Sequence, residues 1–178
     1  MNTRKVAHMG LMIALALVLS YVEAQIPTFV AIPGIKVGLA NIVVVFALYS
    51  FGTKEAFVVS IFRVLLAALM FGSVMSLAYS AAGAFLSLLG MILLKKSGLF
   101  GCVAVSVVGG MLHNLGQILM ACLVLETNVV IYYLPFLVLS GTIAGVVVGL
   151  VAALVLKRLG NSEPQDGSHD DDDATGDK

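Results

Sequence analysis

An arginine within an apolar segment is the first residue of this sequence that could do chemistry. Arg63 follows Phe57 by about two helical turns in a run that is otherwise hydrophobic. A guanidinium at that depth in a membrane needs an acid, a carbonyl or an anionic ligand as its partner. A structural ion pair would meet this need, and so would a carboxylate or phosphate of a substrate. Arg63 is therefore a candidate substrate contact.

A second group of polar side chains occupies another apolar segment. His113 and Gln117 are four residues apart and share one face of a helix, with Asn114 one step round. Asn41, in a different segment, could reach the same interior. Hydrogen bonds between helices, worth about 0.6 to 2 kcal/mol each, would account for these groups, and contact with a ligand is the alternative. A lone histidine without a second metal-type ligand at suitable spacing predicts no metal site.

Residues 25–49 place prolines, glycines, a lysine and an asparagine between hydrophobic residues. Proline fixes φ and removes a backbone donor, so the chain must be irregular here. Irregular backbone at membrane depth is buried in protein or lines a watery cavity. We therefore expect an outward-facing pocket roofed by residues 25–36, with Pro33, Gly34 and Lys36 among its contacts. An ordinary exterior loop is the alternative.

Three charges fall at the expected outer ends of helices, namely Glu23, Lys36 and Glu126. Each could simply extend its charged group to water. Their convergence on one side favours a binding mouth, with Glu23 and Lys36 at its rim.

The composition predicts the environment in which these residues act. Of the 178 residues, 60% are hydrophobic and 11% charged, and the mean hydropathy is +1.07. Soluble domains have about 25% charged residues, so this is an integral membrane protein. Apolar runs of about 20 residues predict spanning helices. We expect an all-α polytopic fold with six transmembrane helices, near residues 6–24, 36–51, 56–71, 76–94, 102–125 and 130–156.

The charges predict the topology and the domains. Residues 1–160 hold nine Lys or Arg against three acids, and residues 161–178 hold seven acids against Lys178. Basic residues gather at the termini and in two loops, which places both termini in the cytoplasm. We expect a six-helix membrane domain over residues 1–160 and a disordered acidic cytoplasmic tail over residues 161–178.

Small residues recur at two helical positions suited to close packing. Ala16, Ser20 and Ala24 are spaced by four on the first helix, and Gly141, Gly145 and Gly149 form two overlapping GxxxG repeats on the last. Such stripes let another helix backbone approach closely, within the bundle or from a partner protein. For the glycines, packing within the bundle is the simpler use.

The run Pro33-Gly34-Ile35-Lys36-Val37-Gly38-Leu39-Ala40-Asn41 resembles a bacterial membrane family called both heptaprenyl diphosphate synthase component I and Gx transporter. The opening ALALVLSYVEA and the HNLGQ run support the resemblance, which covers about residues 5–158. That family is similar to the substrate-binding S components of energy-coupling-factor transporters. These are six-helix subunits that act with a membrane coupling protein and two ATPases. In them, small residues of the first helix dock the coupling protein, and Ala16, Ser20 and Ala24 match that pattern imperfectly.

The two family names imply different functions. Prenyl elongation requires aspartate-rich DDxxD motifs that hold magnesium. No aspartate precedes Asp166, and the run Asp170 to Asp173 is followed by alanine. We therefore expect no enzyme and no cofactor.

The expected function is the substrate-binding subunit of a small-molecule importer in the bacterial cytoplasmic membrane. Because the chain has no Walker motif, separate ATPase subunits would supply the energy. A non-catalytic membrane partner of a heptaprenyl or polyprenyl diphosphate synthase is the alternative. Besides a substrate, the expected partners are the lipid bilayer and a membrane coupling protein with two ATPases; no nucleic acid is expected.

Overall fold

The chain folds into a bundle of helices, as expected from its apolar runs. In a computed structural model, residues 3–25 and 38–160 are described, and this part contains no strand. The helices are α1 (Thr3–Gln25), α2 (Asn41–Ser50), α3 (Thr53–Phe71), α4 (Val74–Ser97), α5 (Cys102–Leu125), the short 3₁₀ helix η1 (Val129–Tyr133) and α6 (Leu134–Gly160). The prediction of an all-α fold is confirmed.

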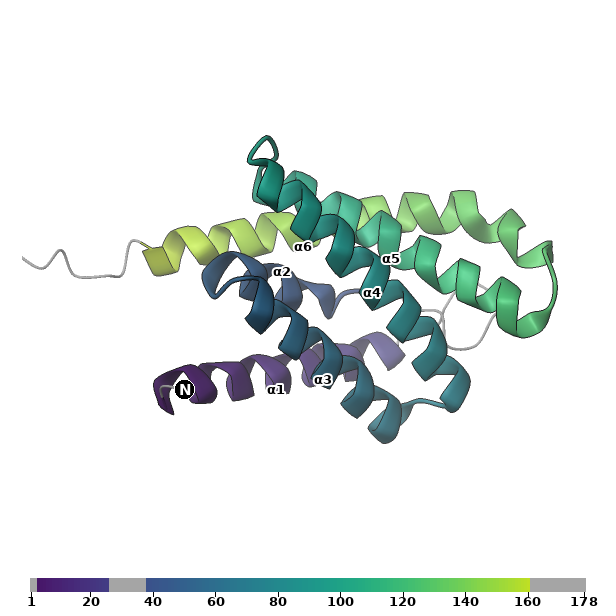
Figure 1. Cartoon of the computed structure of the whole chain (residues 1–178), viewed down its shortest axis with the longest axis horizontal. Coiled ribbons are helices and arrows are strands. Elements are labelled where there is room, and N and C mark those ends of the chain that lie inside the picture. Colours follow the sequence, from purple (N-terminus) through teal and green to yellow (C-terminus); the bar gives the residue numbers. More distant parts are fainter. Residues whose placement is uncertain (1–2, 26–37, 161–178) are drawn as a thin grey trace, which may run out of the picture.

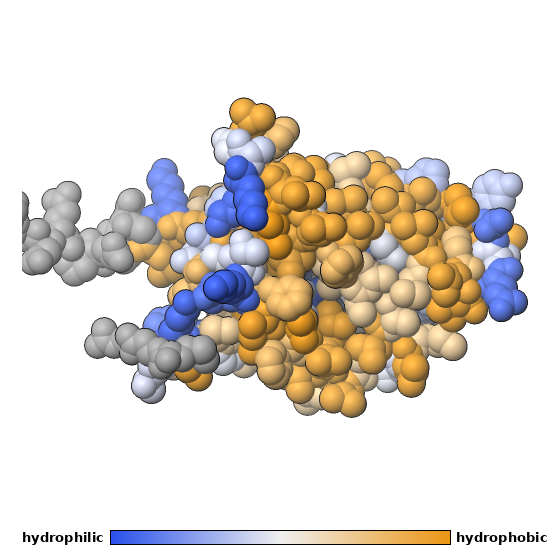
Figure 2. Space-filling model, in the orientation of Figure 1, coloured by the Kyte–Doolittle hydropathy of each residue, from blue (hydrophilic) through white to orange (hydrophobic). Residues whose placement is uncertain are grey.

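The surface has the polarity of a membrane protein. Figure 2 shows hydrophobic residues over the middle of the bundle and hydrophilic residues at its two ends. Four large apolar side chains are each more than 70% exposed, namely Leu69, Val74, Leu99 and Leu123. Exposure of such side chains to water is unfavourable. Four helical stretches are long and apolar enough to cross a membrane, namely Lys5–Gln25, Val74–Ser97, Cys102–Leu125 and Val129–Leu159. Of the other two helices, α2 is short and α3 carries three charged residues.

The neighbours around the bundle follow the order α1, α3, α4, α5, α6 and α2, with α2 closing the ring against α1 and α3 (Figure 1). Ten residues of α2 rise only about 15 Å. Val43, Val44, Val45, Ala47 and Leu48 are buried on this helix, and the side chains of its remaining face, Ile42, Phe46 and Tyr49, are partly buried. A helix that is apolar on every side belongs in an interior, and α2 forms the centre of the larger hydrophobic core.

The second helix begins later than the sequence indicated. We expected it from Lys36, but residues 38–40 form a turn and α2 begins at Asn41. The backbone at Gly38 has φ of +93°, which an L side chain rarely adopts. This conformation interrupts any helix that would run through it. The Asn41 N–H then donates to the Gly38 carbonyl at 2.9 Å.

The sixth helix is also divided. We expected one helix from about Val130, but Val129–Tyr133 is a separate 3₁₀ helix and α6 begins at Leu134. Pro135 lies in the first turn of α6. Proline suits that place, because the N–H it lacks would have no helical partner there.

One end of the bundle carries both described termini. Figure 1 shows the start of α1, the end of α6, the α2–α3 turn and the α4–α5 connection at the same end. Lys95 and Lys96 lie in the last turn of α4, and Lys157 and Arg158 in the last turn of α6. At this end the Lys95 ammonium also donates to the carbonyl of Leu48, joining α4 to α2. Basic residues therefore gather at the end that carries both described termini.

The glycine repeat of α6 packs within the chain. A Cβ atom at Gly145 would lie 2.6 Å from the Cα of Val107, and one at Gly149 would lie 2.8 Å from the Cα of Val103. A Cβ at Gly141 would lie 2.8 Å from the carbonyl oxygen of Gly110. Side chains at these positions would push α5 and α6 apart. The glycines thus allow the two backbones to touch, as in small-residue helix pairs of membranes.

The small residues of α1 do not form one exposed stripe. Ala16 is fully buried in the larger hydrophobic core, and Ser20 is 4% exposed. Ala24 is exposed. Helices α2 and α3 pack against α1, so Ala16 and Ser20 serve packing within the bundle, and docking of a partner along this stripe stays a prediction.

Candidate ligand-binding site

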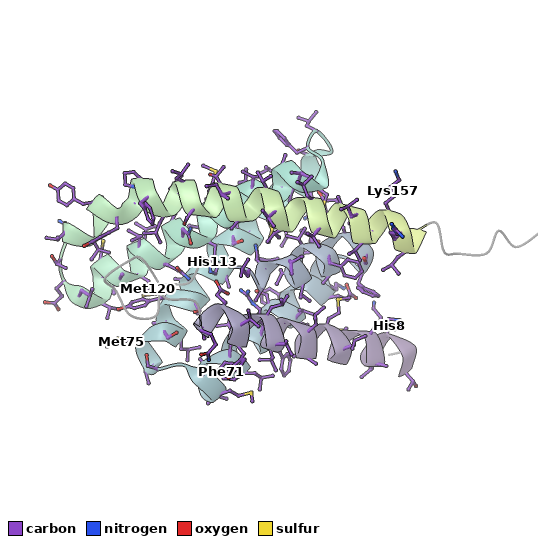
Figure 3. All side chains as sticks on the ribbon, turned by 180° about the vertical axis from the view of Figure 1, so that it is seen from behind. His8, Phe71, Met75, His113, Met120 and Lys157 are labelled. Carbon is purple, nitrogen blue, oxygen red and sulfur yellow. The ribbon has the colours of Figure 1, made fainter. Side chains whose placement is uncertain are left out.

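A polar cavity lies inside the apolar bundle. It is lined by Ser20 and Glu23 from α1, Arg63 from α3, Ser80 from α4 and His113 from α5, together with Val64 and Ala67. Its volume is about 20 Å³, enough for roughly one water molecule. Figure 3 shows His113 deep in the bundle, away from the end that carries His8 and Lys157. We call this space the polar cavity.

The polar cavity separates two hydrophobic cores. Along α5, Val105 belongs to the larger core and Ile118 to the smaller one, and His113 lies between them. Along α4, Leu88 and Tyr79 occupy the corresponding places. The bundle is therefore filled by apolar side chains on both sides of a polar layer.

Glu23 is buried and holds the start of α2. It is 5% exposed, and its Oε1 atom accepts the backbone N–H of Gly38 and, at 3.3 Å, that of Leu39. No described residue donates to Oε2. Hydrogen bonds from backbone amides stabilise a carboxylate in its charged form. One oxygen of Glu23 is thus structural, and the other has no donor in the described part of the chain.

Arg63 has no hydrogen-bond partner among the described residues. Its side chain is 5% exposed, and its buried Nε–H is unsatisfied. Its one electrostatic neighbour there is Glu23, which does not come close enough to form an ion pair. A guanidinium has five N–H donors. A buried donor without a hydrogen bond costs about 1–3 kcal/mol. Arg63 therefore lines the polar cavity with hydrogen-bond donors that no described residue satisfies.

His113 is held by close contacts with α4 and with its own helix. Its Nε2 atom and the amide nitrogen of Gln117 are 3.0 Å apart. A Cβ at Gly83 of α4 would lie 2.7 Å from the carbonyl oxygen of His113 and 3.0 Å from its Nδ1. A Cβ at Gly38 would lie 3.4 Å from its ring. The ring is therefore positioned by glycines on two sides and by Gln117.

The two asparagines of the predicted site lie outside the polar cavity. Asn41 donates to the Ser87 hydroxyl of α4 at 3.4 Å, and Asn114 donates to the Leu137 carbonyl of α6 at 2.6 Å. Both side chains join neighbouring helices, which is the structural alternative for these residues.

The predicted rim is only partly described. Glu126 is exposed in the turn after α5, whereas Glu23 is buried, and Glu126 is not among the described residues that line the polar cavity. Pro33, Gly34 and Lys36 lie outside the described residues.

Four residues of the site were not predicted as ligand contacts. Ser80 and Ser20 line the polar cavity, and Gly38 and Gly83 shape its wall. Serines in an apolar helix carry no distinctive spacing. Gly38 stood within the segment that the sequence marked as irregular.

The described residues also form two apolar grooves and no candidate metal site. One groove, of about 300 Å³, lies between α3 and α4, and the other, of about 430 Å³, lies among α1, α2 and α6. No group of three His, Cys, Asp or Glu side chains is close enough to hold a metal in residues 3–25 and 38–160.

Comparison with known proteins gives one match. The family model described as heptaprenyl diphosphate synthase component I matches residues 12–155, which is well over half of the chain. No curated protein and no solved structure matches. The chain belongs to the heptaprenyl diphosphate synthase component I family.

Proposed function

We propose that this protein is the substrate-binding membrane subunit of a small-molecule importer, with a bundle like that of the S components. The observation that carries the proposal is Arg63, a buried arginine that lines the polar cavity and has no hydrogen-bond partner among residues 3–25 and 38–160. Ionisable groups inside a membrane bundle are costly and mark substrate or ion pathways. A bundle that served only as an anchor would have no need of this arrangement.

The proposal assigns the energy source to other subunits. The sequence has no Walker motif, so ATP hydrolysis would come from two separate ATPases through a membrane coupling protein. All six helices would lie in the bacterial cytoplasmic membrane with both termini in the cytoplasm. The basic residues at the end that carries both described termini favour this orientation.

The second candidate is a non-catalytic membrane component of a heptaprenyl or polyprenyl diphosphate synthase. It is favoured by the family description and by the two apolar grooves, which have room for part of an isoprenoid chain. The polar cavity counts against it as a diphosphate site, because it holds about one water and lies between a single arginine and a glutamate. A diphosphate would need more positive charge.

Purification of the tagged protein from its native membrane in mild detergent, followed by mass spectrometry, separates the two candidates. Recovery of a membrane coupling protein with two ATPases would support the importer. Recovery of a soluble prenyltransferase without ATPases would refute it in favour of the synthase component.

Uptake or binding of any small molecule that co-purifies then tests the site. We expect Arg63→Ala and His113→Ala to abolish binding, because both side chains line the polar cavity. Glu126→Gln, which changes an exposed acid outside the cavity, is the matched control. Unchanged affinity in both cavity variants would place the substrate elsewhere.

A further inference from the structure

The polar cavity contains two opposite charges that do not neutralise each other by direct contact. Glu23 and Arg63 both line it, yet they form no ion pair. Within the described residues, Glu23 Oε2 has no donor and Arg63 has no acceptor. A ligand group that fits between them must therefore accept from one side and donate to the other.

Charge balance narrows the class of ligand. The described lining of the cavity has one acidic and one basic side chain, Glu23 and Arg63, whose charges offset each other. An anion at Arg63 would leave the Glu23 charge uncompensated inside an apolar bundle, and a cation at Glu23 would do the same for Arg63. Uncompensated charge in a low-dielectric interior is strongly unfavourable. A neutral group with an acceptor and a donor on neighbouring atoms avoids both costs.

The size of the polar cavity fits the same class. A volume of about 20 Å³ corresponds to about one water molecule, so the cavity can receive only the polar edge of a larger molecule and excludes a diphosphate. Ser20 and Ser80 add hydroxyl groups that can donate or accept at its wall.

We propose that the polar cavity binds an uncharged amide-type group of the substrate, such as a carboxamide or the CO–NH edge of a heterocycle. Its carbonyl oxygen accepts from Arg63, and its N–H donates to Glu23 Oε2. This inference rests on the proposed ligand-binding function and names the substrate class for the same site. It replaces the carboxylate or phosphate that Arg63 alone suggested.

Three small compounds of similar size test the proposal on the full chain in phosphatidylcholine nanodiscs. Acetamide, acetate and methylammonium are titrated separately, and binding is followed by saturation-transfer NMR of the compound. Acetamide should bind the native protein at least about tenfold more tightly than either ion, since a nearby unit charge at an effective dielectric of about 20 is worth more than that factor. Tighter binding of acetate, or no binding of acetamide, would overturn the proposal.

Charge-changing variants make the test specific to these two residues. Glu23→Gln keeps a carbonyl acceptor for Gly38 and Leu39 but leaves Arg63 as the only charge, so the preference should shift to acetate. Arg63→Gln should shift it to methylammonium. The two shifts are opposite in sign, so either variant is informative if the other fails to fold. Glu126→Gln should keep the native preference, and an unchanged preference in a folded cavity variant would refute the assignment.

The failure of this inference is distinguishable from failure of the importer. Co-purification of the coupling protein and ATPases does not depend on the three compounds. If those subunits are recovered while acetate is preferred, the importer function is supported and the amide-type ligand is refuted. If they are absent while acetamide is preferred, the cavity binds amides but serves another function.

Discussion

Glu23 should stabilise the protein mainly by holding the backbone at the start of α2. Its Oε1 atom accepts the N–H groups of Gly38 and Leu39, the second at 3.3 Å. A hydrogen bond to a charged group contributes about 1.5–3 kcal/mol. Because the Leu39 contact is long, we expect Glu23→Ala to lower the free energy of unfolding by about 3–5 kcal/mol.

Glu23→Gln separates this tether from the charge. The glutamine side chain keeps an oxygen that can accept both N–H groups, and neutral hydrogen bonds are roughly half as strong as charge-assisted ones. Both substitutions remove the negative charge near Arg63, so the cost of leaving that arginine uncompensated is the same in the two variants. We therefore expect the hydrogen bonds lost in Glu23→Gln to lower the free energy of unfolding by about 1.5–2.5 kcal/mol. The two variants should then differ in stability by about the same amount.

The assay is reversible unfolding by a denaturing detergent in mixed micelles, combined with amide exchange at Gly38 and Leu39 measured by NMR. Exchange at these two amides should accelerate in Glu23→Ala and much less in Glu23→Gln. Equal stability of the two variants, with exchange at Gly38 and Leu39 unchanged from the native protein, would refute the tether.

Three further substitutions test the packing around the site by the same unfolding assay. Gly38→Ala should cost about 1–2 kcal/mol, because the backbone there has φ of +93°; no loss would show that the turn relaxes freely. Gly145→Ala should cost about 1–3 kcal/mol by overpacking, since its Cβ would lie 2.6 Å from the α5 backbone. Gly10→Ala, inside α1 where nothing lies within 4 Å, is its control and should be neutral or stabilising, because alanine is the better helix former; equal losses would contradict the close contact. Asn114→Ala should cost about 0.6–2 kcal/mol through the lost hydrogen bond to Leu137 and should leave the acetamide preference intact; a changed preference would instead make Asn114 part of the site.

Much of the fold could be predicted because its signals are local. The apolar runs gave the positions of the helices, and α5 begins and ends at the predicted residues, Cys102 and Leu125. The start of α2 was missed because hydropathy does not report φ, and Gly38 could as well have been helical. The break before α6 was missed because Val130 to Tyr133 is as apolar as the helix that follows.

The candidate site was only partly predictable, because polarity within an apolar segment does not say which neighbour a side chain meets. Arg63, His113 and Glu23 do face one cavity. Asn41 and Asn114 have the same sequence signature, yet each bonds another helix. The difference depends on helix rotation and on which helices are adjacent, and both are properties of the whole bundle.

The division of the polar cavity between two parts of the chain has a consequence for the order of assembly. Helices α4, α5 and α6 follow one another and have the most extensive contacts, and contacts that are local in sequence form readily. Ser20, Glu23 and Arg63 come from α1 and α3, whereas Ser80 and His113 come from α4 and α5. The cavity is therefore complete only after the two parts have joined, and a ligand bound there stabilises the joined state. We expect acetamide to slow hydrogen exchange in α1 and α3 more than in α6; equal slowing in all three would mean that the bundle opens as one unit.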